Sequence, residues 1–160
     1  MAIEPIVAIA PLLPPELQLW LEWGGSKLLA MQLSSGAPRQ PHIAWPEYRQ
    51  SFNTAYGSSA ERMRPSRPSS KEIQAVDEIL ALPSLLPNPL VRRILHARAL
   101  VAPISNRYLC SWTELGDRLD LDRRKVKQLH QRGIEDLTSC VPVSKIYTIR
   151  PVVRIFSLTS

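Results

Sequence analysis

The first stretch with apolar residues at helical spacing begins near residue 14. It contains Leu17, Trp20, Leu21, Leu28 and Met31. Residues three and four positions apart share one face of an α-helix. Pro14 and Pro15 suit the first helical turn, so the pattern predicts a helix from this point. Two consecutive glycines, at 24 and 25, predict a weak point within it.

Two further helices are predicted between residues 69 and 103. Ser69 and Glu72 have the capping-box spacing, in which the serine caps the helix and the glutamate bonds back to the cap amide. One apolar face follows and Pro83 ends this helix; the face consists of Ile73, Val76, Ile79 and Leu80. The next helix begins after Pro87-Asn88-Pro89 and ends before Pro103. Its predicted apolar positions are Leu90, Ile94, Leu95 and Ala97, with Arg92, Arg93 and Arg98 on its other faces.

A helix pair with a short turn is predicted between Ser111 and Leu137. Ser111 and Glu114 form a second capping box, so a helix begins at Trp112, with Leu115 and Leu119 facing inward. Asp120-Leu121-Asp122 interrupts the helix, and Asp120 is expected at a positive φ, where glycine is common. Asp122 is the predicted cap of the next helix, from Arg123 to Leu137. Its packing stripe is Val126, Leu129, Gly133 and Leu137.

The segments between and after these helices have other patterns. Prolines and glycines from Ser34 to Pro68 predict an extended connector, with a short helix at about Pro46 to Tyr56 anchored by Trp45 and Phe52. After Pro142 apolar and polar residues alternate, which predicts a strand or a docking tail.

The predicted fold class is therefore mainly α: a small helical domain with a C-terminal helix-turn-helix, long Pro-rich connectors and a possible short strand in the tail. Four segments follow from the patterns. Residues 1–37 form an apolar arm and helix, 38–68 a basic Pro-rich connector, 69–140 the helix-turn-helix DNA-binding domain, and 141–160 the C-terminal tail.

The positive charge of the chain lies after residue 60. The net charge is +6, yet residues 1 to 60 carry three Lys/Arg against four acids, and the remaining hundred carry seventeen against ten. Such an excess favours a polyanionic partner, usually nucleic acid, although a solvated basic surface is the alternative.

The outward residues of the last predicted helix have the chemistry of a major-groove reader. Arginine and lysine donate to guanine, glutamine pairs with adenine, and the remaining cations hold phosphates. An ordinary helical hairpin with a basic surface is the alternative. Arg62, Arg64 and Arg67 lie in a linker, where they either contact phosphates or the minor groove or are simply solvated. The predicted DNA-binding residues are Arg123, Arg124, Lys127, Gln128, Gln131, Arg62, Arg64 and Arg67.

Neither an enzyme nor a metal or cofactor site is predicted. There is no glycine-rich phosphate loop, and His42 has no spaced partner. A zinc site would have to combine Cys110, Cys140, His96 and His130, which lack ligand-pair spacing. The apolar opening from Ile3 to Leu13 is broken by prolines and fits neither a signal peptide nor a membrane span. These features predict a cytoplasmic protein of a bacterium or a phage-infected cell.

The order of several short motifs resembles a family of small phage and prophage-like helix-turn-helix proteins. These motifs are Ala44-Trp45-Pro46, Pro68-Ser69, Ala97-Arg98-Ala99, Trp112 and the helix from Arg123 to Leu137. That family includes gene-transfer-agent regulators thought to act as transcription antiterminators, and the helix pair is similar to the sigma-factor region that reads the minus-35 element. The resemblance covers residues 38 to 140 and implies binding to DNA and RNA polymerase. It implies a DNA-reading role for Arg123, Arg124, Lys127 and Gln128, and a structural one for Trp45, Arg98 and Trp112.

Three functions remain open at this point. The preferred one is a phage-type antiterminator or activator that binds double-stranded DNA and RNA polymerase. The alternatives are a plain sequence-specific regulator without polymerase contact, and a DNA-recognition subunit of phage packaging. In the preferred function the helix of Leu17, Trp20, Leu21 and Trp23 either completes the core or docks on the polymerase.

Overall fold

The described part of the chain is built from α-helices. The computed structural model describes residues 10–34 and 68–157. Its elements are α1 (Pro14–Ser34), α3 (Ser70–Ala81), the 3₁₀ helix η2 (Leu82–Leu85), α4 (Pro89–Ala99), α5 (Trp112–Leu119), α6 (Arg123–Cys140) and α7 (Val143–Ser157). This confirms the mainly α fold class. The Pro-rich connector, with Trp45, Phe52 and the arginines at 62, 64 and 67, lies outside the described residues.

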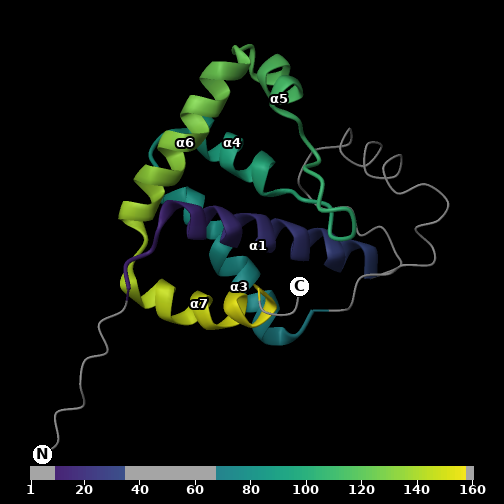
Figure 1. Ribbon diagram of the computed structural model, residues 1–160, viewed down its shortest axis with the longest axis vertical. Helices are drawn as coiled ribbons and strands as arrows, with labels where there is room; N and C mark the ends of the chain where they lie inside the picture. Colours follow the sequence, from purple (N-terminus) through teal and green to yellow (C-terminus); the bar gives the residue numbers. More distant parts are fainter. Residues whose placement is uncertain (1–9, 35–67, 158–160) are drawn as a thin grey trace, which may run out of the picture.

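The helix α1 runs through the middle of the molecule, between α7 and the layer that contains α4 and α6 (Figure 1). It contacts α3, α4 and α6. Leu17, Trp20 and Leu21 are at most 2% exposed and belong to the main hydrophobic cluster. This face of α1 therefore belongs to the core, which favours the first alternative for this helix, while RNA polymerase stays a predicted partner.

The two glycines of α1 mark close helix contacts and not a weak point. A Cβ on Gly25 would lie 2.0 Å from the Ala99 carbonyl oxygen, and one on Gly24 would lie 3.0 Å from Ile79 Cγ2. The helix continues unbroken through both residues. The predicted weak point is thus wrong, because the absent side chains let α1 approach the ends of both α4 and α3.

The capping box of α3 is formed as predicted and also joins α3 to α1. The Ser69 amide donates to Glu72 Oε2 at 2.7 Å, and Glu72 N donates to Ser69 Oγ at 3.3 Å. Lys27 Nζ lies 2.8 Å from Glu72 Oε1. Burial alone would raise the pKa of Glu72, but the hydrogen bonds from Lys27 and Ser69 hold this pKa below its usual value.

The buried face of α3 differs from the predicted one by one position. Ala75, Val76 and Ile79 are buried, whereas Ile73 is 40% exposed. Leu80 is half-buried. The apolar pattern predicted the helix correctly but not its rotation, which the contacts with α1 and α7 decide.

The tail forms the helix α7, so the predicted strand is wrong. Ile146, Ile149 and Val153, at spacings of three and four, are buried in the same cluster as Leu17 and Ile79. The apparent alternation arises from Val143 and Tyr147, which are apolar but exposed. The sequence pattern did not predict this helix because its buried residues are selected by contact with α1 and α3. Both of these helices lie more than 60 residues earlier in the chain.

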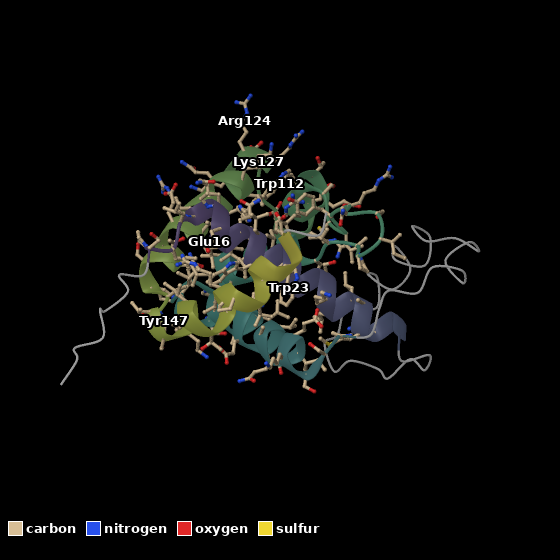
Figure 2. The ribbon with its side chains drawn as sticks, turned by 60° about the horizontal axis from the view of Figure 1, so that its bottom comes forward. Glu16, Trp23, Trp112, Arg124, Lys127 and Tyr147 are labelled. Atoms are coloured by element: carbon tan, nitrogen blue, oxygen red, sulfur yellow. The ribbon has the colours of Figure 1, made fainter. Side chains whose placement is uncertain are left out.

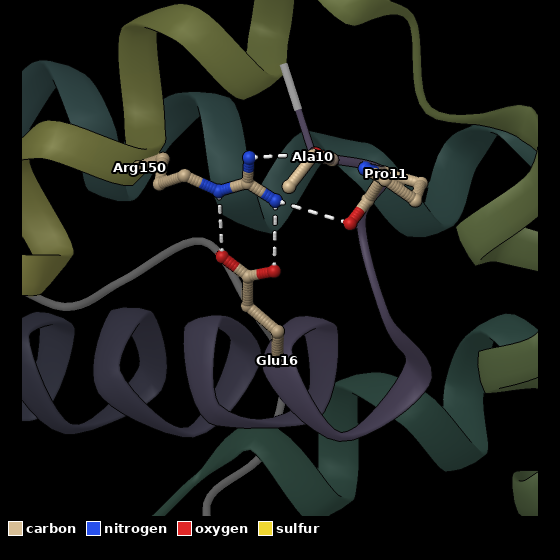
Figure 3. Close-up of polar contacts among 4 residues, drawn as sticks. All are labelled: Ala10, Pro11, Glu16 and Arg150. Carbon is tan, nitrogen blue, oxygen red and sulfur yellow. Dashed lines mark hydrogen bonds and ion pairs between the residues drawn. The ribbon is translucent and has the colours of Figure 1, made fainter. Parts of the chain in front are cut away.

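Arg150 connects α7 to the beginning of α1 (Figure 3). Its Nε donates to Glu16 Oε1 at 2.8 Å, and its Nη2 donates to Glu16 Oε2 at 2.9 Å. Its Nη1 also donates to the Ala10 carbonyl oxygen at 2.8 Å. A guanidinium paired with both oxygens of one carboxylate has a fixed orientation. The last described helix is thereby held against the first.

Candidate nucleic-acid interface

The turn of the predicted helix pair lies at the end of the molecule away from α7, and the far end of the second helix reaches α7 (Figure 1). It consists of α5 and α6, joined by Asp120-Leu121-Asp122. Both predicted caps are present: Ser111 and Glu114 form a capping box, and Asp122 Oδ1 accepts from the Arg124 amide at 2.7 Å. The predicted bounds are confirmed, except that α6 continues beyond Leu137 to Cys140.

The turn depends on two special positions. Asp120 has φ 53° and ψ 46°, which confirms the expected left-handed conformation. The Leu121 amide donates to the Gly116 carbonyl oxygen at 3.0 Å, and a Cβ on Gly116 would lie 2.7 Å from the Leu121 carbonyl oxygen. Gly116 is therefore needed for the chain to fold back over α5. A glycine inside so short a helix costs about 1 kcal/mol relative to alanine. This unfavourable choice is the feature of the sequence that could have indicated a close backbone contact at Gly116.

The inward side of the helix pair packs onto α4. Val126 and Ile94 are fully buried and form a second cluster with Leu115, Ala97 and Cys110. Leu119, Leu121 and Leu129 pack partly buried against it. Leu115, Leu119, Val126 and Leu129 therefore face inward as predicted, and together with Leu121 they pack onto the helix of Ile94. Farther along α6, Ile134 and Leu137 enter the main cluster, so the helix is anchored at two levels.

Arg98 is buried beneath the pair and stacked between two aromatic rings. Its guanidinium carbon lies 3.6 Å from the Tyr108 ring centroid and 4.0 Å from that of Trp112. Its Nη1 donates to the Cys110 carbonyl oxygen at 2.7 Å. The predicted outer position of Arg98 is therefore wrong. Two aromatic rings and a carbonyl oxygen make the contacts that water would make with an exposed guanidinium. Nothing in the local pattern indicated this burial.

Trp112 joins the elements of this region. Besides Arg98, its ring meets the His130 ring edge-on with centroids 5.1 Å apart, and Lys127 Nζ lies 5.8 Å from its centroid. Arg98 belongs to α4, and His130 and Lys127 belong to α6. These contacts support the structural role that the resemblance implied for Arg98 and Trp112.

The outward side of α6 gathers the predicted polar residues. Arg123, Arg124, Lys127, Gln128 and Gln131 are all exposed, and so are Lys125 and Arg132, which the sequence reasoning did not select. We call these seven residues the α6 basic face. Figure 2 shows Arg124 and Lys127 projecting at the same end of the molecule. The first ten residues of α6 contain five cations and no acid, and Glu135 and Asp136 follow.

Carboxylates occupy the neighbouring surface of α5 and the turn. Glu114 and Asp122 are engaged in helix caps, and hydrogen bonds from the Ser111 backbone and side chain lower the pKa of Glu114. Asp117 and Asp120 are also exposed. The exposed charge is therefore positive on the first turns of α6 and mainly negative at the end of α5 and in the turn.

His130 is the buried histidine of the interface. Its side chain is 8% exposed and its ring packs edge-on against the ring of Trp112. Burial, reinforced by the positive charge of Arg98, lowers the pKa of His130 from 6.5 to about 4. It is thus neutral in the folded protein near neutral pH. The described ranges contain no group of three or more His, Cys, Asp or Glu arranged to hold a metal ion.

The low pKa of His130 predicts a loss of stability on mild acidification. As pH falls from 6.5 toward 4, the unfolded chain binds a proton at this residue that the folded chain does not bind. Well between the two pKa values each pH unit costs about 1.4 kcal/mol, so urea unfolding should show a loss of about 1.5 kcal/mol between about pH 6.5 and about pH 5. The His130→Leu variant should lack this component. Equal pH slopes in the two proteins would contradict the assignment.

A comparison with known families places the interface inside a recognised sequence unit. The model of a family described as "Domain of unknown function (DUF6362)" matches residues 31–137, about two thirds of the chain. The match contains α3, α4, α5 and most of α6, whereas α7 lies outside it. Searches of curated proteins and of solved structures found no match. None of the described helices is long and apolar enough to span a membrane.

Proposed function

We propose that this chain, which belongs to the family described as domain of unknown function DUF6362, binds double-stranded DNA through the α6 basic face and regulates transcription. The observation that carries the proposal is that α6 has one buried apolar side and one exposed basic side. One side is anchored in the core through Val126, Ile134 and Leu137. The other presents five cations and two glutamines, the side chains that bind phosphates, guanine and adenine.

The dimensions and position of α6 support duplex DNA as the partner. A helix with its side chains is about 10–12 Å wide, and the major groove is about 12 Å wide. The first turns of α6 lie at the end of the molecule that projects away from α1 and α7 (Figure 1), so a duplex reaches them without meeting these helices. The acidic residues Glu135 and Asp136 begin only where α6 returns toward the core.

A binding series over salt concentration tests the proposal. The full chain is mixed with a labelled random-sequence duplex, and the affinity is measured from about 50 mM to about 200 mM salt. We expect affinity to fall steeply as salt rises, because phosphate binding releases counterions. The double variant Arg124→Glu/Lys125→Glu should lose binding, whereas Lys71→Ala, which removes an exposed cation of α3, should retain it. Equal binding by wild type and the double variant would refute the proposal.

We further propose that the regulator acts on RNA polymerase as an antiterminator or activator, in the cytoplasm of a bacterium or of a phage-infected cell. The similarity of the helix pair to the minus-35-reading region of sigma factors supports this. So do apolar side chains exposed outside the interface: Leu13 is 56%, Val143 59% and Tyr147 55% exposed. Since the face of α1 that contains Leu17, Trp20 and Leu21 is covered, we assign a polymerase contact to Leu13, just before α1, and to the exposed apolar residues of α7.

Read-through of a terminator in a purified transcription system tests the polymerase contact. Val143→Asp/Tyr147→Asp should bind DNA normally but lose read-through, because charge replaces the exposed apolar surface of α7. Ser144→Asp, which adds a charge at an exposed position of the same helix, is the control. Absence of read-through with the wild-type protein would leave a plain DNA-binding regulator as the function.

A further inference from the structure

Helix geometry divides the outward side of α6, which contains the α6 basic face, into one ridge and two flanks. The ridge consists of Arg124, Gln128, Gln131 and Glu135, which are four, three and four residues apart. Val126, which is 0% exposed, lies two positions from both Arg124 and Gln128. Two positions correspond to about 200° around the helix axis, so the ridge points directly away from the core.

A pair of cations lies on each side of this ridge. Arg123 and Lys127 lie on the flank toward α5, as the 5.8 Å distance from Lys127 Nζ to the Trp112 ring centroid shows. Lys125 and Arg132 lie on the other flank, about a quarter turn from the ridge. All four side chains are exposed. The cations therefore form two parallel rows with Arg124 and Gln128 between them.

We propose that Arg124 and Gln128 read base edges, while the two flanking pairs hold the phosphates of opposite strands. This assignment rests on the proposed DNA binding. A helix that fills the major groove turns its outermost ridge toward the base pairs and its flanks toward the two walls of the groove, which are phosphate backbones. It changes the roles of Arg123 and Lys127 from base reading to phosphate binding.

Glu135 limits the part of α6 that can enter the major groove. It lies on the same ridge as Arg124 and Gln128, and its carboxylate is repelled by phosphates. Gln131 Nε2 donates to Glu135 Oε1 at 2.9 Å, so the amide of Gln131 is already engaged with that carboxylate. The base-reading part of the ridge therefore ends before Gln131.

The two readers specify the chemistry of the preferred site. Arginine pairs bidentately with guanine, and glutamine with adenine. Four residues along an α-helix span about 6 Å, which is roughly two base-pair steps. The preferred duplex therefore contains a guanine and an adenine about two base pairs apart.

Selection from a random duplex pool with the full chain tests this assignment. The selected and random duplexes are then titrated with single alanine variants over a salt series. Arg124→Ala and Gln128→Ala should reduce the preference for the selected duplex about 5- to 150-fold. Arg123→Ala, Lys127→Ala, Lys125→Ala and Arg132→Ala should weaken binding to both duplexes alike and lower the salt slope by about one. Lys71→Ala should change neither quantity, and all variants should melt as the wild type does.

The outcomes separate this assignment from the proposed function. Loss of base preference in Lys127→Ala, or its retention in Arg124→Ala, would overturn the division into readers and phosphate contacts while leaving DNA binding intact. Preference for a site without the guanine and adenine would overturn it too. Failure of the wild-type protein to bind any duplex would overturn the proposed function, and this assignment with it.

Discussion

Replacing Val126 with aspartate is expected to unfold the protein. The side chain is fully buried, in the cluster formed with Ile94 and Leu115. An unpaired carboxylate there costs several kcal/mol, whether it stays charged or takes up a proton. Since whole domains are stable by about 5–15 kcal/mol, this single change removes a large share of the stability. Far-UV circular dichroism during urea titration would show a much lower unfolding midpoint, or no folded baseline.

Gln128→Asp is the matched control for this variant. It introduces the same side chain into the same helix two residues later, at an exposed position. Its unfolding midpoint should stay close to that of the wild type, because water solvates the new carboxylate. If Val126→Asp melted cooperatively at the wild-type temperature, the α4–α6 contact would not be part of the core.

Gly25→Ala is expected to destabilise the protein by about 3 kcal/mol or more. In a helix interior this substitution is normally stabilising by about 1 kcal/mol, so its sign distinguishes tertiary contact from helix propensity. The new Cβ would lie 2.0 Å from the carbonyl oxygen and 2.5 Å from the carbonyl carbon of Ala99. Backbone atoms cannot rotate away, so α1 and α4 would have to separate.

The neighbouring variant Gly24→Ala provides the comparison for that measurement. Its Cβ would meet Ile79 Cγ2 at 3.0 Å, and a side-chain methyl group yields more easily than a backbone carbonyl. Urea unfolding should therefore show Gly25→Ala to be clearly less stable than both Gly24→Ala and the wild type. A Gly25→Ala protein as stable as the wild type would show that α1 and α4 are not in close contact.

Features of the fold that depend on near neighbours in sequence were predictable. The capping boxes at Ser69 and Ser111 each need only a glutamate three residues later, and both are formed. The turn at Asp120 and the cap at Asp122 likewise depend on a few adjacent residues. Helix starts and the α5–α6 turn were correct for this reason.

Features set by distant partners were not predictable from the pattern. Arg98 is buried because Tyr108 and Trp112 cover it, and the Tyr108 hydroxyl in turn donates to Glu22 Oε1 of α1 at 2.6 Å. The helical state of α7 depends on partners in α1 and α3. Exposed polar positions on α6 were predicted from the inward stripe alone. The separation of these positions into a ridge and two flanks required knowing which side of α6 is buried along its whole length. DNA and RNA polymerase remain predicted partners.

The pairing of Arg150 with Glu16 has a consequence for synthesis on the ribosome. The two residues are 134 positions apart, so at elongation rates of about 5–20 residues per second Glu16 is made about 7 to 27 s before Arg150. Contacts of such long sequence separation form late in folding. A nascent chain that has emerged only as far as Cys140 therefore exposes the apolar surface that Ile146, Ile149 and Val153 later cover.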